Sequence, residues 1–218
     1  MIRPFDDTTR RNIAGLCAEF ARLPVGEPSP ALKRAAVAIV LAEADAAQGA
    51  VQDAVQAGTA LLLTLRAAGL RAHRGQWALP GGRCDEGETP IGAALRELHE
   101  ELGLALAPAD VLGLLDDYPT RSGYLITPVV VWAAASRGLS PNPAEVASMH
   151  RIALDDLDQA DAFDFVAIPE STRRVVRFRY AGQLIHAPTA AMLYQFREVL
   201  AGRDTRVADL EQPVFAWK

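Results

Sequence analysis

The segment from Gly82 to Leu104 reads GRCDEGETPIGAALRELHEELGL, and it constrains the fold more than any other part of the chain. Thr89 and Pro90 suit the N-cap and the first turn of a helix, and Gly103 is a typical residue at a helix C-terminus. Between these signals, apolar residues recur at helical spacing: Ile91, Ala94, Leu95, Leu98 and Leu102. The segment therefore predicts a glycine-rich loop followed by an amphipathic helix over residues 90–102.

Three glutamates, Glu97, Glu100 and Glu101, share one stripe of this predicted helix. Like charges at this spacing destabilise an isolated helix by about 0.2–0.5 kcal/mol per pair. Arg96 can offset part of that repulsion by pairing with Glu100 or Glu88. A hard divalent cation would offset more, because Mg²⁺ prefers carboxylate and phosphate oxygens. The spacing makes the glutamates candidate metal ligands, and a solvated charged face is the alternative interpretation.

The whole segment resembles the Nudix box at each of its defined positions. These positions are Gly, five spacers, Glu, seven spacers, Arg-Glu-apolar, one spacer, Glu-Glu, one spacer and Gly-apolar. Nudix proteins are mostly hydrolases that split a pyrophosphate joined to another group, with Mg²⁺ or Mn²⁺ as cofactor. The resemblance therefore implies a metal-dependent pyrophosphatase, in which the metal polarises the diphosphate and orients a water for in-line attack.

The same resemblance implies a role for each matching residue. Glu97 and Glu101 match the main metal ligands, and Glu100 matches a further ligand and a candidate base. A backbone carbonyl near Gly82 is expected to add one more ligand. Arg96 is counted with the catalytic set, although we expect it to hold the loop against the helix rather than to take part in the chemistry.

The run in front of the box is basic. No acidic residue occurs between residues 54 and 84, whereas residues 85–101 carry six acids and one arginine. A cationic loop beside an anionic metal site suits a substrate with several phosphates, some bound by metal and some by arginine. A solvated connection after a strand is the alternative interpretation. The basic residues of the run are Arg66, Arg71, His73, Arg74 and Arg83.

This run resembles the motif that precedes the box in Nudix coenzyme A pyrophosphatases. A later match begins at Ser122-Gly123-Tyr124 and continues with Thr127-Pro128-Val129-Val130. The resemblance implies cleavage of coenzyme A, or of its acyl derivatives, to 3′,5′-ADP and 4′-phosphopantetheine or the acyl form. It implies substrate binding by Arg66, Arg71, Arg74 and Gly75. The matching positions of the first motif are Leu62, Leu63, Thr64, Arg66, Ala67, Arg71, Gly75, Pro80, Gly81 and Gly82.

Two departures from that pattern keep the substrate open. Leu79 stands where the coenzyme A subgroup usually has Phe, and His186 stands where it has Trp. Both changes are expected to alter the pocket for the adenine or the pantetheine arm. Another nucleoside diphosphate derivative, such as ADP-ribose or a dinucleotide, is therefore the second hypothesis. A ligand-binding regulator is the third, and it is less favoured because the chain keeps all the box glutamates.

Length and composition bound the remaining possibilities. Half of the 218 residues are hydrophobic, which suits one domain with a sizeable core and additional segments. We divide the chain into an N-terminal helix and linker, 1–30, a Nudix hydrolase domain, 31–202, and a C-terminal tail, 203–218. The N-terminal helix is expected to cap the domain or to form a homodimer contact.

Charge and cysteine usage argue against several classes of protein. A net charge of −5 does not indicate a general nucleic-acid surface. Cys17 and Cys84 indicate reduced thiols rather than a disulfide framework or a zinc site. The N-terminus lacks the apolar core of a signal peptide, and no apolar run approaches the ~20 residues that span a membrane. We expect a cytoplasmic protein with a small-molecule substrate and no membrane partner.

Hydrophobic periodicity predicts the α/β class. The resemblance to Nudix proteins implies an α/β/α sandwich with a mixed β-sheet, and an added N-terminal helix is expected outside it. Helices are expected over 7–23 and 189–201, and a short one from 154. Residues 44–58 are expected to form a hairpin loop or a short helix. The expected strands are 35–41, 59–66, 112–114, 124–132, 150–154, 175–180 and 183–186, the last two joined by a turn at 181–182.

Four further residues are weaker site candidates. Glu145 or Asp117 is a candidate for an additional acid from a late loop, and a solvated loop acid is the alternative interpretation. Tyr118 and Tyr124 are candidates for stacking on a base, with core packing as the alternative.

Overall fold

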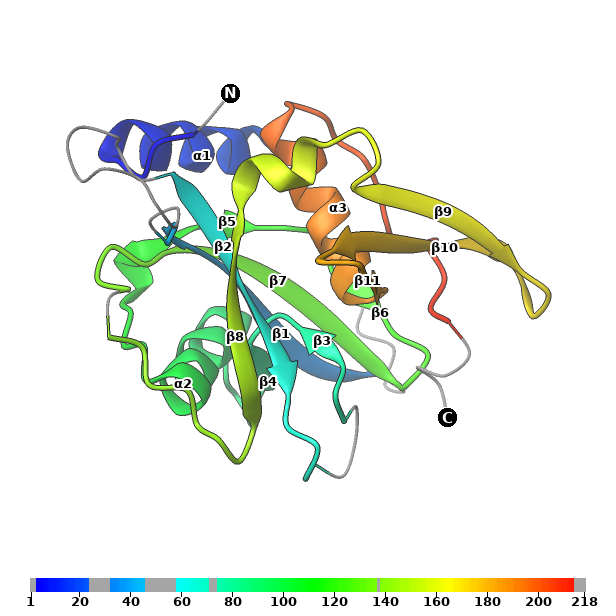
Figure 1. The fold of residues 1–218 in the computed structure, drawn as a ribbon, viewed down its shortest axis with the longest axis horizontal. Helices are drawn as coiled ribbons and strands as arrows, with labels where there is room; N and C mark the ends of the chain where they lie inside the picture. Colours follow the sequence, from blue (N-terminus) through cyan, green and yellow to red (C-terminus); the bar gives the residue numbers. More distant parts are fainter. Residues whose placement is uncertain (1–2, 24–31, 46–57, 71–73, 137, 214–218) are drawn as a thin grey trace.

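The computed structural model describes residues 3–23, 32–45, 58–70, 74–136 and 138–213, and it places a mixed sheet between helices (Figure 1). The main sheet has the strand order β3-β2-β1-β7-β5, with β4 on β1, β6 on β7 and β8 on β2. Only the β1–β7 pair is parallel among the pairings of the described strands. Its strands are β1 (Lys33–Glu43), β2 (Thr59–Arg66), β3 (Trp77–Ala78), β4 (Gly81–Arg83), β5 (Val111–Leu114), β6 (Tyr118–Pro119), β7 (Tyr124–Trp132) and β8 (Val146–Ala153).

A second, antiparallel sheet has the order β11-β10-β9. It consists of β9 (Phe163–Ile168), β10 (Ser171–Tyr180) and β11 (Gln183–His186). The helices are α1 (Asp7–Glu19), α2 (Pro90–Leu102) and α3 (Thr189–Leu200), with short 3₁₀ turns η1 (Pro108–Asp110) and η2 (Leu154–Asp158).

The two faces of β1 belong to two different hydrophobic cores. Small side chains on one face, including Ala36 and Ala38, pack with Ala93 and Ala94 of α2. Larger side chains on the other face belong to the core that contains α1 and α3. The alternation follows from the two-residue period of a strand, and the small residues let α2 approach the sheet closely. The predicted α/β/α sandwich is confirmed.

Several predicted elements are confirmed at their exact bounds, namely the box helix α2, β2 and β7. The predicted hairpin turn is also present, with positive φ at Ala181 and Gly182, as a tight two-residue turn requires. The first strand and the strand at 150–154 are longer than predicted, and β10 begins at Ser171. Most of the segment 44–58 lies outside the described residues. Strands β3, β4, β6 and β9 were not predicted.

The predicted helix over 7–23 was wrong at its C-terminal end, because α1 ends at Glu19. Phe20 is extended, with φ −61° and ψ 115°. The residues that follow contact the segment between β5 and β6. Leu23 N–H donates to Asp116 at 2.8 Å, and Arg22 pairs with Asp117 at 2.8 Å. These tertiary contacts outcompete the continuation of the helix.

The two terminal segments contact the central domain. Buried side chains of α1, Ile13 and Cys17, enter the core shared with α3. Arg206, in the C-terminal segment, pairs with the buried Asp116 at 2.9 Å. Among the described helices, none is long and apolar enough to cross a membrane.

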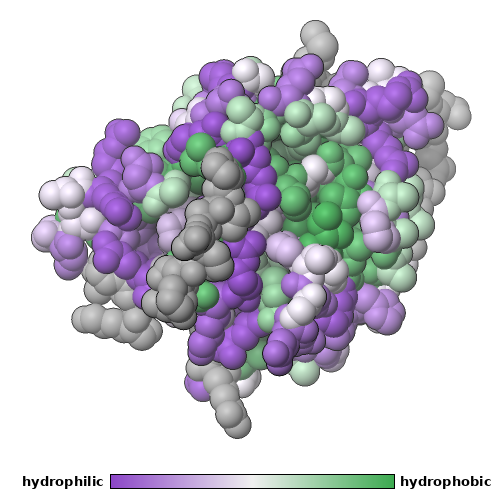
Figure 2. Space-filling model, turned by 180° about the vertical axis from the view of Figure 1, so that it is seen from behind, coloured by the Kyte–Doolittle hydropathy of each residue, from purple (hydrophilic) through white to green (hydrophobic). Residues whose placement is uncertain are grey.

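Seen from behind the view of Figure 1, the surface carries an apolar area surrounded by hydrophilic side chains (Figure 2). β5 ends the strand order of the main sheet, and each of its four residues is partly exposed. The structure contains a single chain, so the homodimer stays a prediction.

Candidate active site

Local sequence signals at both ends of α2 fix the glutamates of the box. Thr89 Oγ accepts the Gly92 N–H at 3.1 Å, and the left-handed Gly103 donates its N–H to the His99 carbonyl. With the apolar stripe buried, the three glutamates differ in exposure. The side chains of Glu97 and Glu101 are 15% and 4% exposed. That of Glu100 is 52% exposed, so it lies at the rim.

Two glycines of β4 lie directly against the buried carboxylates. Gly81 N–H donates to Glu101 Oε2 at 3.3 Å. A Cβ atom at Gly82 would lie 2.2 Å from Glu97 Oε1, and one at Gly81 would lie 2.3 Å from the Ala36 carbonyl oxygen. Neither position has room for a side chain. The Gly-Gly pair therefore brings the backbone close to both carboxylates. The backbone carbonyl near Gly82 as a metal ligand stays a prediction.

Burial shapes the charge of these two carboxylates. Burial raises the pKa of Glu101 to about 7; Arg66 opposes this shift, and the charge of Glu97 adds to it. Burial also raises the pKa of Glu97, against the effect of Arg96. Two desolvated, mutually repelling carboxylates would be stabilised by a cation between them.

The carboxylates of Glu97 and Glu101 fit a Mg²⁺ or Mn²⁺ ion that binds together with the substrate. Within the described residues, no three His, Cys, Asp or Glu side chains form a ready-made metal cage. Mg²⁺ is usually held by one or two carboxylates together with waters and substrate phosphates, not by an all-protein cage. The two buried carboxylates, Glu97 and Glu101, match that pattern.

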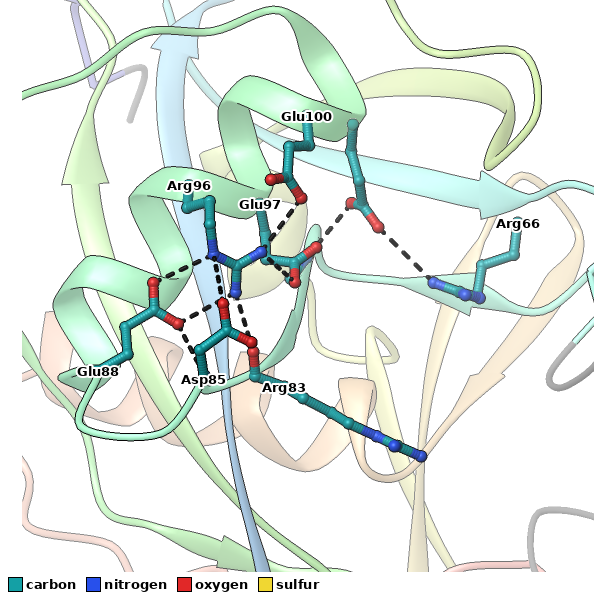
Figure 3. A network of polar contacts seen from close by, with 9 residues as sticks. Arg66, Arg83, Asp85, Glu88, Arg96, Glu97 and Glu100 are labelled. Carbon is teal, nitrogen blue, oxygen red and sulfur yellow. Dashed lines mark hydrogen bonds and ion pairs between the residues drawn. The ribbon is translucent and has the colours of Figure 1, made fainter.

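Arg96 connects the loop to the helix, as expected (Figure 3). Its guanidinium donates to both oxygens of Glu88 at 3.1 Å and to the Arg83 carbonyl at 2.9 Å. It also donates to Glu97 at 2.9 Å and to Glu100 at 3.1 Å. The hydrogen bonds that Glu88 accepts from Arg96 hold the pKa of Glu88 below its usual range. Arg96 thus neutralises the outer side of the glutamate stripe.

The structure brings one of the predicted substrate-binding arginines to the glutamates. Arg66 Nη1 lies 3.7 Å from Glu101 Oε1. Arg74 is exposed, and its Nε–H donates to the Leu70 carbonyl within the same loop. Gly75 is left-handed and donates its N–H to the Arg66 carbonyl at 3.1 Å. Arg71 lies outside the described residues.

The two candidates for an additional acid differ. Asp117 is occupied structurally: it pairs with Arg22 at 2.8 Å and with Arg34 at 3.0 Å, so its assignment as a site acid is corrected. The charge of Glu145, in contrast, contributes to the raised pKa of both Glu97 and Glu101. Glu145 therefore lies near the two buried glutamates of the box.

The two tyrosine candidates also separate. Tyr118 is buried and donates its hydroxyl to the Leu210 carbonyl at 2.8 Å, so it packs in the core and does not face a base. Tyr124 is partly exposed, and the guanidinium carbon of Arg83 lies 5.2 Å from its ring centroid. Of the two, Tyr124 remains the candidate for contact with a ligand.

Sequence reasoning missed Asn142. Its N–H donates to the Glu101 carbonyl at 2.8 Å, at the C-terminal end of α2. Its side-chain amide donates to Glu145 Oε1 at 3.3 Å, and its side-chain oxygen accepts the Ala144 N–H at 3.1 Å. Asn-Pro dipeptides favour turns, and the Asn142-Pro143 pair before Glu145 was the available signal.

Comparisons with known proteins agree with this geometry. A family model described as the NUDIX domain matches residues 33–171. A protein of Photorhabdus laumondii named uncharacterized Nudix hydrolase NudL is 35% identical over 141 residues, which cover 63% of this chain and 75% of that protein. Its namesake from Pectobacterium atrosepticum is 36% identical over 146 residues, which cover 66% and 76%.

Among solved structures, a MutT/nudix family protein from Enterococcus faecalis superposes with a TM-score of 0.50 at 18% identity, covering 90% of this chain and 75% of that one. This likeness supports the fold. Nudix hydrolases act on small-molecule nucleoside diphosphate substrates and generally use divalent metal ions. From the complete box, its buried glutamate pair and the match over most of the chain, we conclude that the protein belongs to the NUDIX domain family and is a hydrolase of pyrophosphate bonds.

Proposed function

We propose that this hydrolase cleaves the diphosphate of coenzyme A or of its acyl derivatives, releasing 3′,5′-ADP and 4′-phosphopantetheine or the acyl form. The observation that carries this proposal is the contact between the two motifs. Arg66, from the motif in front of the box, lies 3.7 Å from Glu101 of the box helix. Coenzyme A carries a 3′-phosphate besides its diphosphate, so an arginine beside a metal site suits it.

Each group in the site has a proposed task. Glu97 and Glu101, with the backbone at Gly82, would hold Mg²⁺ or Mn²⁺. Such an ion would polarise the diphosphate and lower the pKa of a water. Glu145 is the proposed proton acceptor. As the water oxygen bonds to phosphorus, one proton passes to Glu145, the bridging P–O bond breaks and the leaving phosphate keeps the electron pair.

Glu100 has no direct part in proton transfer in this mechanism. Its side chain is about half exposed and already accepts from Arg96 at 3.1 Å. Arg83 extends away from the glutamates (Figure 3) beside Tyr124, which comes from the later motif of the subgroup. Arg83 and Tyr124 therefore form the proposed contact for the adenosine part of the substrate.

The test is a substrate panel with the purified full chain and either Mg²⁺ or Mn²⁺. Coenzyme A, acetyl-coenzyme A, ADP-ribose and diadenosine polyphosphates are incubated separately, and products are identified by mass spectrometry. We expect 3′,5′-ADP and 4′-phosphopantetheine from coenzyme A. Glu97→Gln, with unchanged folding, should lower turnover by about a hundredfold or more. Intact coenzyme A beside cleaved ADP-ribose would refute the substrate proposal and leave the hydrolase assignment standing.

Another nucleoside diphosphate derivative is the second candidate, and His186 favours it. This half-buried residue lies on β11 where the coenzyme A subgroup carries Trp, and burial lowers the pKa of its imidazole.

Leu79, the other departure, is 3% exposed inside the core shared with α3. Leu79 therefore fills core volume, and the expectation that it lines a substrate pocket is corrected.

A further inference from the structure

Arg66 has a buried polar group with no partner. Its Nε–H is inaccessible to solvent and makes no hydrogen bond, one of two such buried side-chain atoms in the described part of the chain. Buried donors are almost always satisfied in folded proteins, because an unmet donor costs about 1–3 kcal/mol. An unsatisfied guanidinium N–H beside the Glu101 carboxylate therefore requires an explanation.

The backbone of Arg66 is fixed on both sides. Its N–H donates to the Gln76 carbonyl at 3.0 Å, and its carbonyl accepts from Gly75 at 3.1 Å. On its other side it pairs with Val146 of β8. The guanidinium, in contrast, makes one ion pair within the described part of the chain, at 3.7 Å, which is longer than a hydrogen bond. A fixed backbone with a loosely held guanidinium is the arrangement expected of a side chain that has two alternative partners.

The Glu101 carboxylate, unlike the Arg66 guanidinium, has little free space around it. Its two oxygens face Arg66 and the Gly81 N–H, at 3.7 and 3.3 Å. A divalent cation on Glu101 would repel the guanidinium, and the 4% exposed carboxylate has little room for both cations. Arg66 and the metal therefore compete for Glu101.

We propose that Arg66 substitutes for the metal in the free protein. It neutralises Glu101 until the divalent cation binds, and then turns its guanidinium, including the unsatisfied Nε–H, to a phosphate oxygen of the substrate. Arg66 is thus a positioning residue for Glu101 in one state and a substrate ligand in the other. This inference rests on the proposed metal-dependent cleavage of a diphosphate, whichever nucleoside derivative carries it.

The test measures metal binding without substrate, on the full chain. Mn²⁺ affinity is determined by calorimetry and by electron paramagnetic resonance for the unaltered protein, Arg66→Gln and Arg66→Lys. We expect Arg66→Gln to bind Mn²⁺ about three- to tenfold more tightly, because the competing cation is gone. In turnover assays the same variant should raise KM by about ten- to a hundredfold. Arg66→Lys keeps the competing charge and should bind Mn²⁺ as the unaltered protein does.

Two controls separate this proposal from a general charge effect. Arg11→Gln removes the same charge from the exposed surface of α1, where Arg11 contacts Thr8 at 3.3 Å, and should leave Mn²⁺ affinity unchanged. In a Glu101→Gln background, Arg66→Gln should no longer tighten Mn²⁺ binding. Weaker or equal Mn²⁺ binding by Arg66→Gln would overturn the proposal. Because Mn²⁺ binding is measured without substrate, its result does not depend on whether the substrate panel supports or refutes coenzyme A.

Discussion

At the scale of single residues, Gly82 is the most stringent position of the site. A Cβ there would lie 2.2 Å from Glu97 Oε1, so Gly82→Ala must displace either the strand or the carboxylate. Displacing a reacting group by about 1 Å can cost about a hundredfold in rate. We expect a loss of that size in kcat/KM together with weaker Mn²⁺ binding.

Gly15→Ala is the matched control for that substitution, because nothing lies within 4 Å of the new methyl group on α1. Its kcat/KM should equal that of the unaltered protein. Equal activity of Gly82→Ala and Gly15→Ala would show that the carboxylate does not need the glycine.

The raised pKa of Glu101 has a consequence for stability in the metal-free protein. Burial, the largest cause, raises this pKa to about 7, so the folded state binds the proton more tightly than the unfolded chain does. The contribution is therefore stabilising at low pH and is lost as pH rises between the unfolded and folded pKa values. For this group alone, a rise from 4.5 to about 7 amounts in total to about 3 kcal/mol.

The measurement is urea unfolding in EDTA at pH 5 and pH 8. From pH 5 to pH 8 the unaltered protein should lose about 2–3 kcal/mol more stability than Glu101→Gln, which has no group to titrate. An identical pH dependence for the two proteins would contradict this assignment.

At the scale of elements, the loop before β8 places Glu145. Asn142 links this loop to the last turn of α2 through the Glu101 carbonyl and links its own amide to Glu145 at 3.3 Å. Ala67 N–H donates to the Glu145 carbonyl at 2.8 Å, so the loop is held by α2 on one side and by the end of β2 on the other. The orientation of Glu145 thus depends on a neighbour three residues away.

We predict that Asn142→Ala lowers kcat by about tenfold with little change in KM. Complete removal of a proton acceptor costs about a hundredfold. The defect is expected to be smaller here because Glu145 is still present and only misplaced. Asn142→Asp keeps the acceptor for Ala144 but loses the amide donor and adds a like charge beside Glu145. Steady-state kinetics should therefore give Asn142→Asp the same defect. Full activity of Asn142→Asp would mean that the turn alone positions the loop.

How far the sequence predicts an element depends on where its determinants lie. The box helix was predicted at its exact bounds because its caps and apolar stripe are local. Strands β3 and β4 were missed because each has two or three residues and exists through pairing with β2 and β1. The same holds for the site: periodicity grouped the three glutamates, whereas the burial of Glu101 and its contact with Arg66 depend on tertiary packing.

At the scale of the whole molecule, the C-terminal segment connects the second sheet to the main sheet. Glu211 is 2% exposed, and its N–H donates to the Arg174 carbonyl of β10 at 2.8 Å. Its carboxylate accepts from Ser171 at 2.8 Å and from Arg121, in the turn before β7, at 2.6 Å. Residues 203–213, which the sequence analysis assigned to a C-terminal tail (203–218), therefore contribute to the packing between the sheets.

Glu211→Ala should consequently lower Tm by several degrees, whereas Asp209→Ala, which removes an exposed charge from the same segment, should not. The Arg121 hydrogen bond, the largest cause, lowers the pKa of Glu211 to about 2. This contribution is therefore present above the unfolded pKa and is lost as pH falls from about 4.5 towards 2. Thermal melts at pH 7 and pH 3 should show the Tm difference between Glu211→Ala and the unaltered protein shrinking at pH 3. An equal difference at both pH values would mean that the carboxylate acts through packing and not through its charge.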